Sequence, residues 1–125
     1  MTTLLIALCG GVGAVARFVV DAEVRRRVRG SFPVGTFVIN VLGSFVLGIL
    51  TGAATHHAGW LSPTAKAALG TGFCGGFTTF STASVETTRL WLTTGKAESS
   101  RYAVATAAIS LLAAFVGLGI GTACA

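Results

Sequence analysis

Four long stretches of this chain contain no Lys, Arg, Asp or Glu, and they constrain the fold more than any other feature. They cover residues 1–16, 30–65, 67–85 and 102–125. A helix that crosses a bilayer needs about 20 mostly apolar residues, and stretches of this length supply them. Only 10% of the residues are charged, whereas a water-soluble domain carries about 25%. We therefore predict an integral membrane protein, and not a soluble enzyme, a disordered tail or a nucleic-acid-binding module.

These stretches predict an all-α membrane protein with four transmembrane helices in a single domain, residues 1–125. The predicted spans lie at about 4–20, 34–55, 65–92 and 102–123. Helices are favoured because backbone groups in lipid must be satisfied internally and because the strands of a membrane barrel would alternate in polarity. The third span has a middle rich in Gly and Thr, and we expect it to be broken at residues 75–79.

The basic residues are distributed unevenly between the predicted loops. Eight of the nine flank the first and third loops, and Lys66 is the one near the second loop. The positive-inside rule then places loops one and three in the cytoplasm and both termini outside. The expected location is the plasma membrane of a microbe, with several passes. The arginines at 25–29 serve as a topology anchor that can contact membrane lipid, and no nucleic-acid partner is expected.

The second and fourth spans each carry small and polar residues about one helical turn apart. The residues are Thr36, Asn40, Ser44 and Gly48 in the second span, and Thr106, Ser110, Gly117 and Gly121 in the fourth. Pairs of glycines four residues apart, at 48 and 52, 72 and 76, and 117 and 121, favour close helix packing. An amide at mid-membrane depth needs partners, so Asn40 either lines a pathway or holds a neighbouring helix.

The middle of the third span, residues 72–82 (GFCGGFTTFST), contains adjacent glycines followed by four hydroxyl side chains. Glycine weakens a helix by about 1 kcal/mol relative to alanine, and nearby hydroxyls can bond the backbone groups that are freed. We expect a discontinuous helix here, whose carbonyls can ligate a cation and whose second half can attract an anion at its N-terminus. The alternative is a helix that is only kinked at Gly75 and Gly76.

Glu86 is the one carboxylate inside a predicted span. It can act as a proton or cation-coupling site, or it can form an ion pair with Arg89 one helical turn away, and the sequence leaves both interpretations open. His56 and His57 are predicted to be solvated residues of the second loop.

Three motifs in order resemble the CrcB, or Fluc, family of fluoride channels. They are residues 10–18 (GGVGAVARF), 35–45 (GTFVINVLGSF) and 72–82, with Glu86 following. Together they extend from the first span to the third, and the chain length and four-span pattern fit the rest. The resemblance implies passive export of fluoride rather than enzymatic activity.

The resemblance also implies an antiparallel, dual-topology dimer with two pores and a central structural sodium ion that is not transported. By motif, the sodium ligands are the backbone carbonyls of Gly75 and Thr78. Asn40 and Phe80 match pore-lining residues of the family. Tyr102 and Ser110 match polar positions near the pore, and Arg17 matches a basic residue near the aqueous mouth, where Thr36 and Glu86 are also expected.

The residue chemistry agrees with a fluoride pathway. A pore must replace the water around this small anion with donors, which the amide of Asn40 and nearby hydroxyls offer. The hydroxyl residues expected to line the pore are Thr79, Ser81, Thr82 and Ser110. The edges of phenylalanine rings are electropositive and can also contact an anion.

Two features depart from the family pattern. Position 83 is Ala83, where the family commonly has a second phenylalanine, and the strong charge bias predicts a single orientation. The chain therefore pairs either with itself or with a paralogous, oppositely oriented subunit. Two further functions stay open: a weakly conducting or non-conducting partner subunit, and a small multidrug antiporter. An antiporter is disfavoured because its essential carboxylate is expected in the first span, and residues 4–20 contain none.

Overall fold

The computed structural model is all-helical and describes residues 1–56, 59 and 61–124. Within these residues the chain contains helices and no β-strand. Three helices are long and apolar enough to cross a membrane: Thr2–Arg27, Val34–Thr55 and Lys96–Ala123. The expected all-α class is therefore confirmed. The solvation predicted for His56 and His57 lies outside the part of the chain whose side chains the structure describes.

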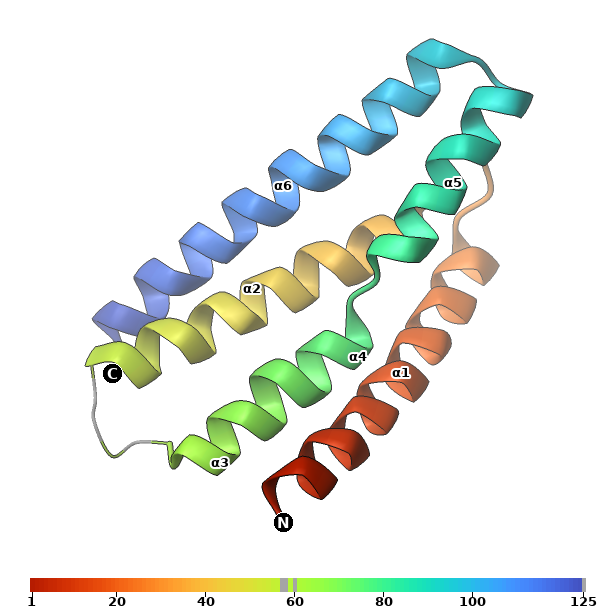
Figure 1. Cartoon of the computed structure of the whole chain (residues 1–125). Helices are drawn as coiled ribbons and strands as arrows, with labels where there is room; N and C mark the ends of the chain where they lie inside the picture. Colours follow the sequence, from red (N-terminus) through yellow and green to blue (C-terminus); the bar gives the residue numbers. More distant parts are fainter. Residues whose placement is uncertain (57–58, 60, 125) are drawn as a thin grey trace.

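The helices follow one another with short connections (Figure 1). Helix α1 covers Thr2–Arg27, α2 covers Val34–His56 and α6 covers Lys96–Ala123. Between α2 and α6 lie α3 (Pro63–Lys66), the π-helix η1 (Ala67–Cys74), α4 (Gly75–Phe77) and α5 (Phe80–Thr93). Helix α2 nearly coincides with the predicted span at 34–55, whereas α1 and α6 both extend beyond theirs.

Local sequence explains where the shorter helices begin and end. The Ser62 side chain accepts a hydrogen bond from the backbone N–H of Ala65 at 3.1 Å, and Pro63 occupies the first helical position of α3. Both are typical of a helix N-terminus. Gly95 has φ +114° between α5 and α6, a conformation that favours glycine, and the chain reverses direction there.

The connections lie at two ends of the bundle. The α1–α2 and α5–α6 connections share one end, and both termini lie toward the other (Figure 1). The first of these ends, which carries most of the basic residues, is called the basic end below. This arrangement agrees with the loop pairing expected from four antiparallel passes.

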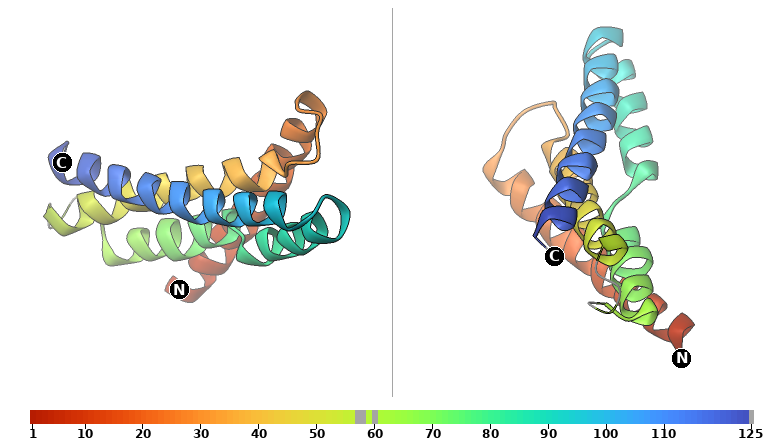
Figure 2. Two further views of the ribbon diagram at one scale, coloured as in Figure 1. Left: turned by 90° about the horizontal axis from the view of Figure 1, so that it is seen from above. Right: turned by 90° about the vertical axis from the view of Figure 1, so that its left-hand side faces the viewer.

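Helices α2 and α6 pack side by side along their length, as both views of Figure 2 show. A Cβ atom on Gly48 would lie closer than 3.0 Å to the carbonyl oxygen of Ala114, and one on Gly117 would lie as close to that of Phe45. The two backbones are therefore in direct contact, which confirms the packing role predicted for these glycines.

The glycines of α4 are helical, so within the range 75–79 predicted for the break the chain leaves the helix only at Thr78 and Thr79. The physical reason is packing of α1 against η1 and α4. A Cβ atom on Gly76 would lie closer than 3.0 Å to the carbonyl oxygen of Gly10. This close contact favours the helical form despite the low helix propensity of glycine.

The outer surface of the bundle is strongly apolar. Exposed side chains on α1 include Leu8, Val15 and Phe18, and those on α6 include Leu112 and Phe115. Such side chains would be costly in water but match a lipid environment. The apolar surface and the three long apolar helices indicate a multi-pass membrane protein.

Candidate functional site

The helical segments on either side of residues 78 and 79 are separate. Helix α4 ends at Phe77, Thr78 has φ −77° and ψ 159°, and Thr79 has φ −151° and ψ 118°. Both residues are extended, and α5 begins at Phe80. The interruption follows the glycines instead of including them.

Hydroxyl side chains satisfy backbone groups beside this interruption. The Thr78 hydroxyl donates to the carbonyl oxygen of Cys74 at 2.9 Å. The Thr79 hydroxyl accepts from the backbone N–H of Thr82 at 3.1 Å and so caps α5. It also hydrogen-bonds the hydroxyl of Thr82 and lies 3.2 Å from that of Ser81. Thr82 and Ser81 therefore support the cap of α5.

Asn40 of α2 joins the interruption through two hydrogen bonds. Its Nδ2 donates to the carbonyl oxygen of Thr79 at 2.9 Å, and its Oδ1 accepts from the N–H of Thr79 at 2.8 Å. Both residues are buried, at 9% and 7% exposure. One N–H of the amide is left over after these bonds. The interhelical interpretation of Asn40 is confirmed, and its remaining N–H is free for a further acceptor.

Gly43 allows α2 to lie close to the interruption. A Cβ atom at Gly43 would lie closer than 3.0 Å to the side-chain methyl carbon of Thr78. Gly43 lies nearly one turn beyond Asn40, so both residues are on the same face of α2. This face carries the Asn40 amide and, at Gly43, leaves room for the Thr78 side chain.

A groove of about 620 Å³ adjoins Asn40 and is bounded by α2, α5 and α6. It brings together five residues that the sequence assigns to the pore or its mouth: Asn40, Thr79, Phe80, Tyr102 and Ser110. It also includes Thr106, which the sequence pattern places on the polar face of the fourth span without assigning it to the site. The spacing of four residues from Tyr102 and from Ser110 is the signal that identifies Thr106.

Three hydroxyls of α6 form a row along this groove. The side-chain oxygens of Tyr102, Thr106 and Ser110 are buried and have no hydrogen-bond partner among the described residues. The hydroxyl of Tyr102 lies near those of Thr36 and Thr106 but without good hydrogen-bond geometry. Buried polar groups normally have partners, so an unpartnered row of donors indicates a place for a polar ligand.

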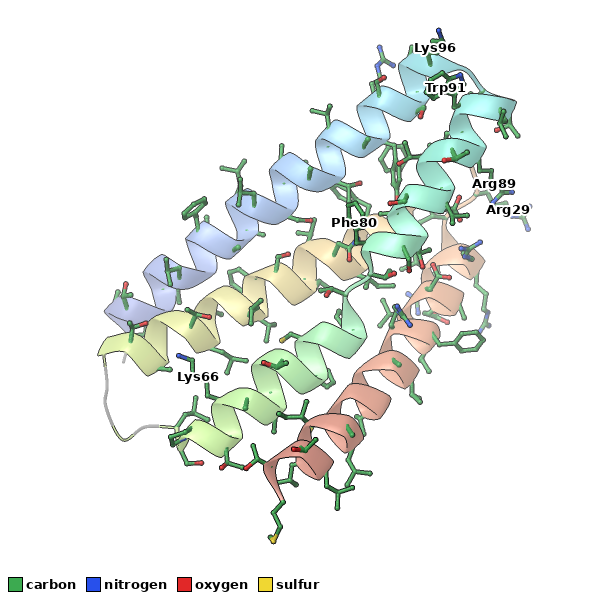
Figure 3. All side chains as sticks on the ribbon, viewed as in Figure 1. Arg29, Lys66, Phe80, Arg89, Trp91 and Lys96 are labelled. Carbon is green, nitrogen blue, oxygen red and sulfur yellow. The ribbon has the colours of Figure 1, made fainter. Side chains whose placement is uncertain are left out.

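Phe80 lies at the edge of the same groove. Its side chain is 88% exposed, and Figure 3 shows it at the start of α5, directly after the interruption. Ala83, which also lines the groove, follows three residues later. The groove therefore has one aromatic side chain from α5 and a small residue where a second one would lie.

The other residues predicted for the pore or its mouth do not line this groove. Thr36 is buried at 2% exposure near Tyr102. Arg17 is half-buried within α1. Ser81 and Thr82 lie in the first turn of α5, beside the cap. Their prediction as pore-lining residues finds no support in the groove of the single chain.

Glu86 lies in a second cavity, a pocket of about 340 Å³ at the basic end. It is buried at 8% exposure, and its carboxylate oxygens lie 3.5 Å from the guanidinium nitrogens of Arg25 and of Arg89. Arg25 also donates to Asp21 at 2.8 Å. The ion pair between Glu86 and Arg89, one of the two interpretations that the sequence leaves open, is present, and Arg25 adds a second one from α1.

Carbonyl oxygens are the groups beside the interruption that suit a cation. Within the described part of the chain, no three His, Cys, Asp or Glu side chains cluster as a metal site. In an α-helix the carbonyls of Gly75 and Thr78 would accept from the N–H groups of Thr79 and Thr82. Those N–H groups bond Asn40 and the Thr79 hydroxyl instead. These two carbonyls are thus without their usual helical donors, and they fit a hard cation such as sodium.

Known proteins resemble this chain over most of its length. The family model "CrcB-like protein, Camphor Resistance (CrcB)" matches residues 4–118. A protein of Cutibacterium acnes named "Fluoride-specific ion channel FluC 2" is 49% identical over 122 residues, which cover 98% of both chains. The protein named "Fluoride-specific ion channel FluC 1" of Streptomyces avermitilis is 48% identical over 94% of each chain. That of Leifsonia xyli, also named FluC 1, is 56% identical over 72% of this chain and 64% of its own.

Proposed function

The chain belongs to the CrcB family, and from that premise we propose that it is a subunit of a fluoride-specific ion channel. Its relatives carry that name, and they are channels rather than enzymes. Fluoride would leave the cell passively, down its electrochemical gradient, and the cytoplasmic concentration would fall. The observation that carries the proposal is the row of buried, unpartnered hydroxyls on α6 facing the amide of Asn40.

The hydroxyl row suits a small anion that must exchange its hydration shell for protein donors. The hydroxyls of Tyr102, Thr106 and Ser110 each offer one O–H, and their Cα atoms follow one another about 6 Å apart along the helix axis. An anion can therefore move between neighbouring donors in short steps. The free N–H of Asn40 adds a donor from the opposite helix. Selectivity would follow from the width of the groove and its donors, as in other channels.

Phe80 adds an aromatic edge to this pathway. Its ring is exposed in the single chain, and its positive edge can face an anion. Ala83 supplies no such edge, so a partner subunit would have to contribute the missing aromatic contact. The absence of an aromatic side chain at position 83 also supports the second candidate function, a weakly conducting or non-conducting subunit.

A second subunit is needed because the groove is open to the surface of the chain and Phe80 projects from it. The proposed assembly is an antiparallel dimer. Its partner is either a second copy in the opposite orientation or a paralogue. The excess of basic residues on one side favours the paralogue. The numbered names FluC 1 and FluC 2 of the relatives support this choice.

The carbonyls of Gly75 and Thr78 would hold a structural sodium ion between the subunits. Gly75 is exposed on the single chain, where a second chain can approach it. Two carbonyls from each chain would give four oxygen ligands. When bound, the ion supplies positive charge that fixes the two interruptions against each other. Asn40 and the Thr79 hydroxyl bind the N–H groups of Thr79 and Thr82, which would otherwise donate to these carbonyls. The two side chains thereby leave the carbonyls available to the ion.

Fluoride efflux from liposomes tests the proposal and its rivals. A channel subunit releases fluoride with sodium present and releases less when sodium is replaced by a large organic cation. A non-conducting subunit releases fluoride only with a second CrcB-type chain. An antiporter would release fluoride under neither condition but would exchange protons for organic cations. Expression without any second CrcB-type chain decides the partner question, since fluoride-conducting dimers in that case would exclude an obligatory paralogue.

A further inference from the structure

Two separate cavities lie on either side of the contact between Phe32 and Tyr102. The pocket at the basic end is lined by the end of α1, residues 30–35 and α5. The groove is lined by α2, α5 and α6. Phe32 belongs to the lining of the pocket, and Tyr102 belongs to that of the groove. The contact between these two side chains is thus part of the wall between the cavities.

The wall is aromatic. The ring centroids of Phe32 and Tyr102 are 5.3 Å apart with an interplanar angle of 80°. Phe32 also packs against Phe37 of α2, at 6.0 Å and 68°. Tyr102 has 0% exposure. The Phe32 ring therefore helps to separate the Tyr102 hydroxyl, the first of the α6 row, from the pocket.

The pocket can collect anions despite its carboxylates. Asp21 and Glu86 face the guanidinium groups of Arg25 and Arg89 across it. Among the described residues Arg89 donates no hydrogen bond, and Arg25 donates only through Nε. Each guanidinium has five N–H donors, so donors remain beyond those that face Asp21 and Glu86. Figure 3 shows Arg29 and Arg89 side chains at this same end of the bundle, where positive charge is in excess.

The position of Phe32 depends on side-chain packing rather than on a helix. Residues 28–33 lie between α1 and α2, outside both helices. The ring is fixed by its contacts with Phe37 and Tyr102. The ring can therefore move without moving a helix, whereas displacement of a helical residue would disturb the bundle.

We propose that Phe32 is a partition in the fluoride pathway, which separates an anion-collecting pocket at the basic end from the Tyr102 end of the hydroxyl row. This proposal rests on the proposed function. An anion that reaches the pocket passes the ring of Phe32 to be received by Tyr102. The edges of the ring are positive and tolerate a small anion, while the apolar faces oppose larger hydrated ones. Phe32 would therefore limit the rate of passage and exclude chloride at this end.

The test uses side chains of different size at position 32 in the full-length channel reconstituted into liposomes. Phe32→Ala should raise fluoride efflux roughly tenfold, which corresponds to about 1.4 kcal/mol of barrier, and should admit chloride. Phe32→Trp should lower fluoride efflux. Matched controls are Phe115→Ala and Phe115→Trp on the exposed face of α6, which should leave both rates unchanged.

The outcomes separate this proposal from the proposed function. Absence of fluoride efflux from the unmodified channel, both alone and with a second CrcB-type chain, contradicts the proposed function. Normal efflux of the unmodified channel, with Phe32→Ala unchanged or slower, contradicts the partition alone. Circular dichroism and size-exclusion chromatography verify that each variant folds. If Phe32→Ala does not fold, Phe32→Leu replaces it, and faster efflux with some chloride leak is again required.

Discussion

Replacing Asn40 by alanine is the most informative single perturbation of this molecule. The side chain holds the backbone of Thr79 through two hydrogen bonds, of 2.9 and 2.8 Å, at a buried position. Asn40→Ala removes the partners of both the N–H and the carbonyl of Thr79. It also removes the free N–H that faces the groove. The variant should therefore lose both stability and fluoride efflux.

The size of the stability loss follows from the two groups left unpaired. Each buried backbone group without a partner costs about 1–3 kcal/mol, so the pair costs about 2–6 kcal/mol. Folded domains have a net stability of about 5–15 kcal/mol, so this loss is large but need not abolish folding.

Denaturation in mixed micelles, followed by circular dichroism, measures this loss. The matched control is Ser44→Ala, because Ser44 lines the same groove one turn along α2 and makes no side-chain hydrogen bond among the described residues. Fluoride efflux is measured on both variants. If Asn40→Ala unfolds at the same denaturant concentration as Ser44→Ala, the link between Asn40 and Thr79 does not support the fold. If it conducts fluoride normally, Asn40 has no role in the pathway.

Three further predictions concern packing, the cation and orientation. Gly76→Ala should lower the unfolding midpoint because its Cβ would collide with the Gly10 carbonyl, whereas Gly119→Ala, which meets nothing within 4 Å, should not; equal midpoints would contradict the close packing of α1. Replacing sodium with a large organic cation should dissociate the dimer in detergent, as seen by size-exclusion chromatography, and an unchanged elution volume would argue against a structural sodium. An impermeant thiol reagent should label the exposed Cys124 when it is added to the outer side of the membrane and not when it is added to the cytoplasmic side. Labelling from both sides would show dual topology.

Much of the fold follows from sequence because lipid restricts the choices. Charge-free stretches predict helices, and the structure contains three that are long enough to span a membrane. The exact place of the interruption was not predictable from propensity. Gly75 and Gly76 are poor helix formers, yet close packing against α1 keeps this segment helical. The chain instead leaves the helix at Thr78 and Thr79. There Asn40 of α2, which is distant in sequence, hydrogen-bonds the backbone N–H and carbonyl of Thr79.

The sequence predicts many of the residues of the candidate site but not all of the contacts between them. The period of about four residues along the fourth span points to Thr106 and Ser110, and the structure places both on the groove. The chemistry of Ser81 and Thr82 predicts a place in the pore, but their hydroxyls lie beside the cap of α5. The ion pair between Arg25 and Glu86 joins α1 to α5, and no local spacing indicates it. The same is true of the contact between Phe32 and Tyr102.

The most direct test of the account is anion release from liposomes that contain the purified channel, recorded with fluoride-sensitive and chloride-sensitive electrodes in sodium buffer. Rapid release of fluoride without release of chloride is expected, together with loss of fluoride release in Asn40→Ala. Equal release of the two anions, or fluoride release that survives removal of the Asn40 amide, would contradict a pathway built from that amide and the α6 hydroxyls.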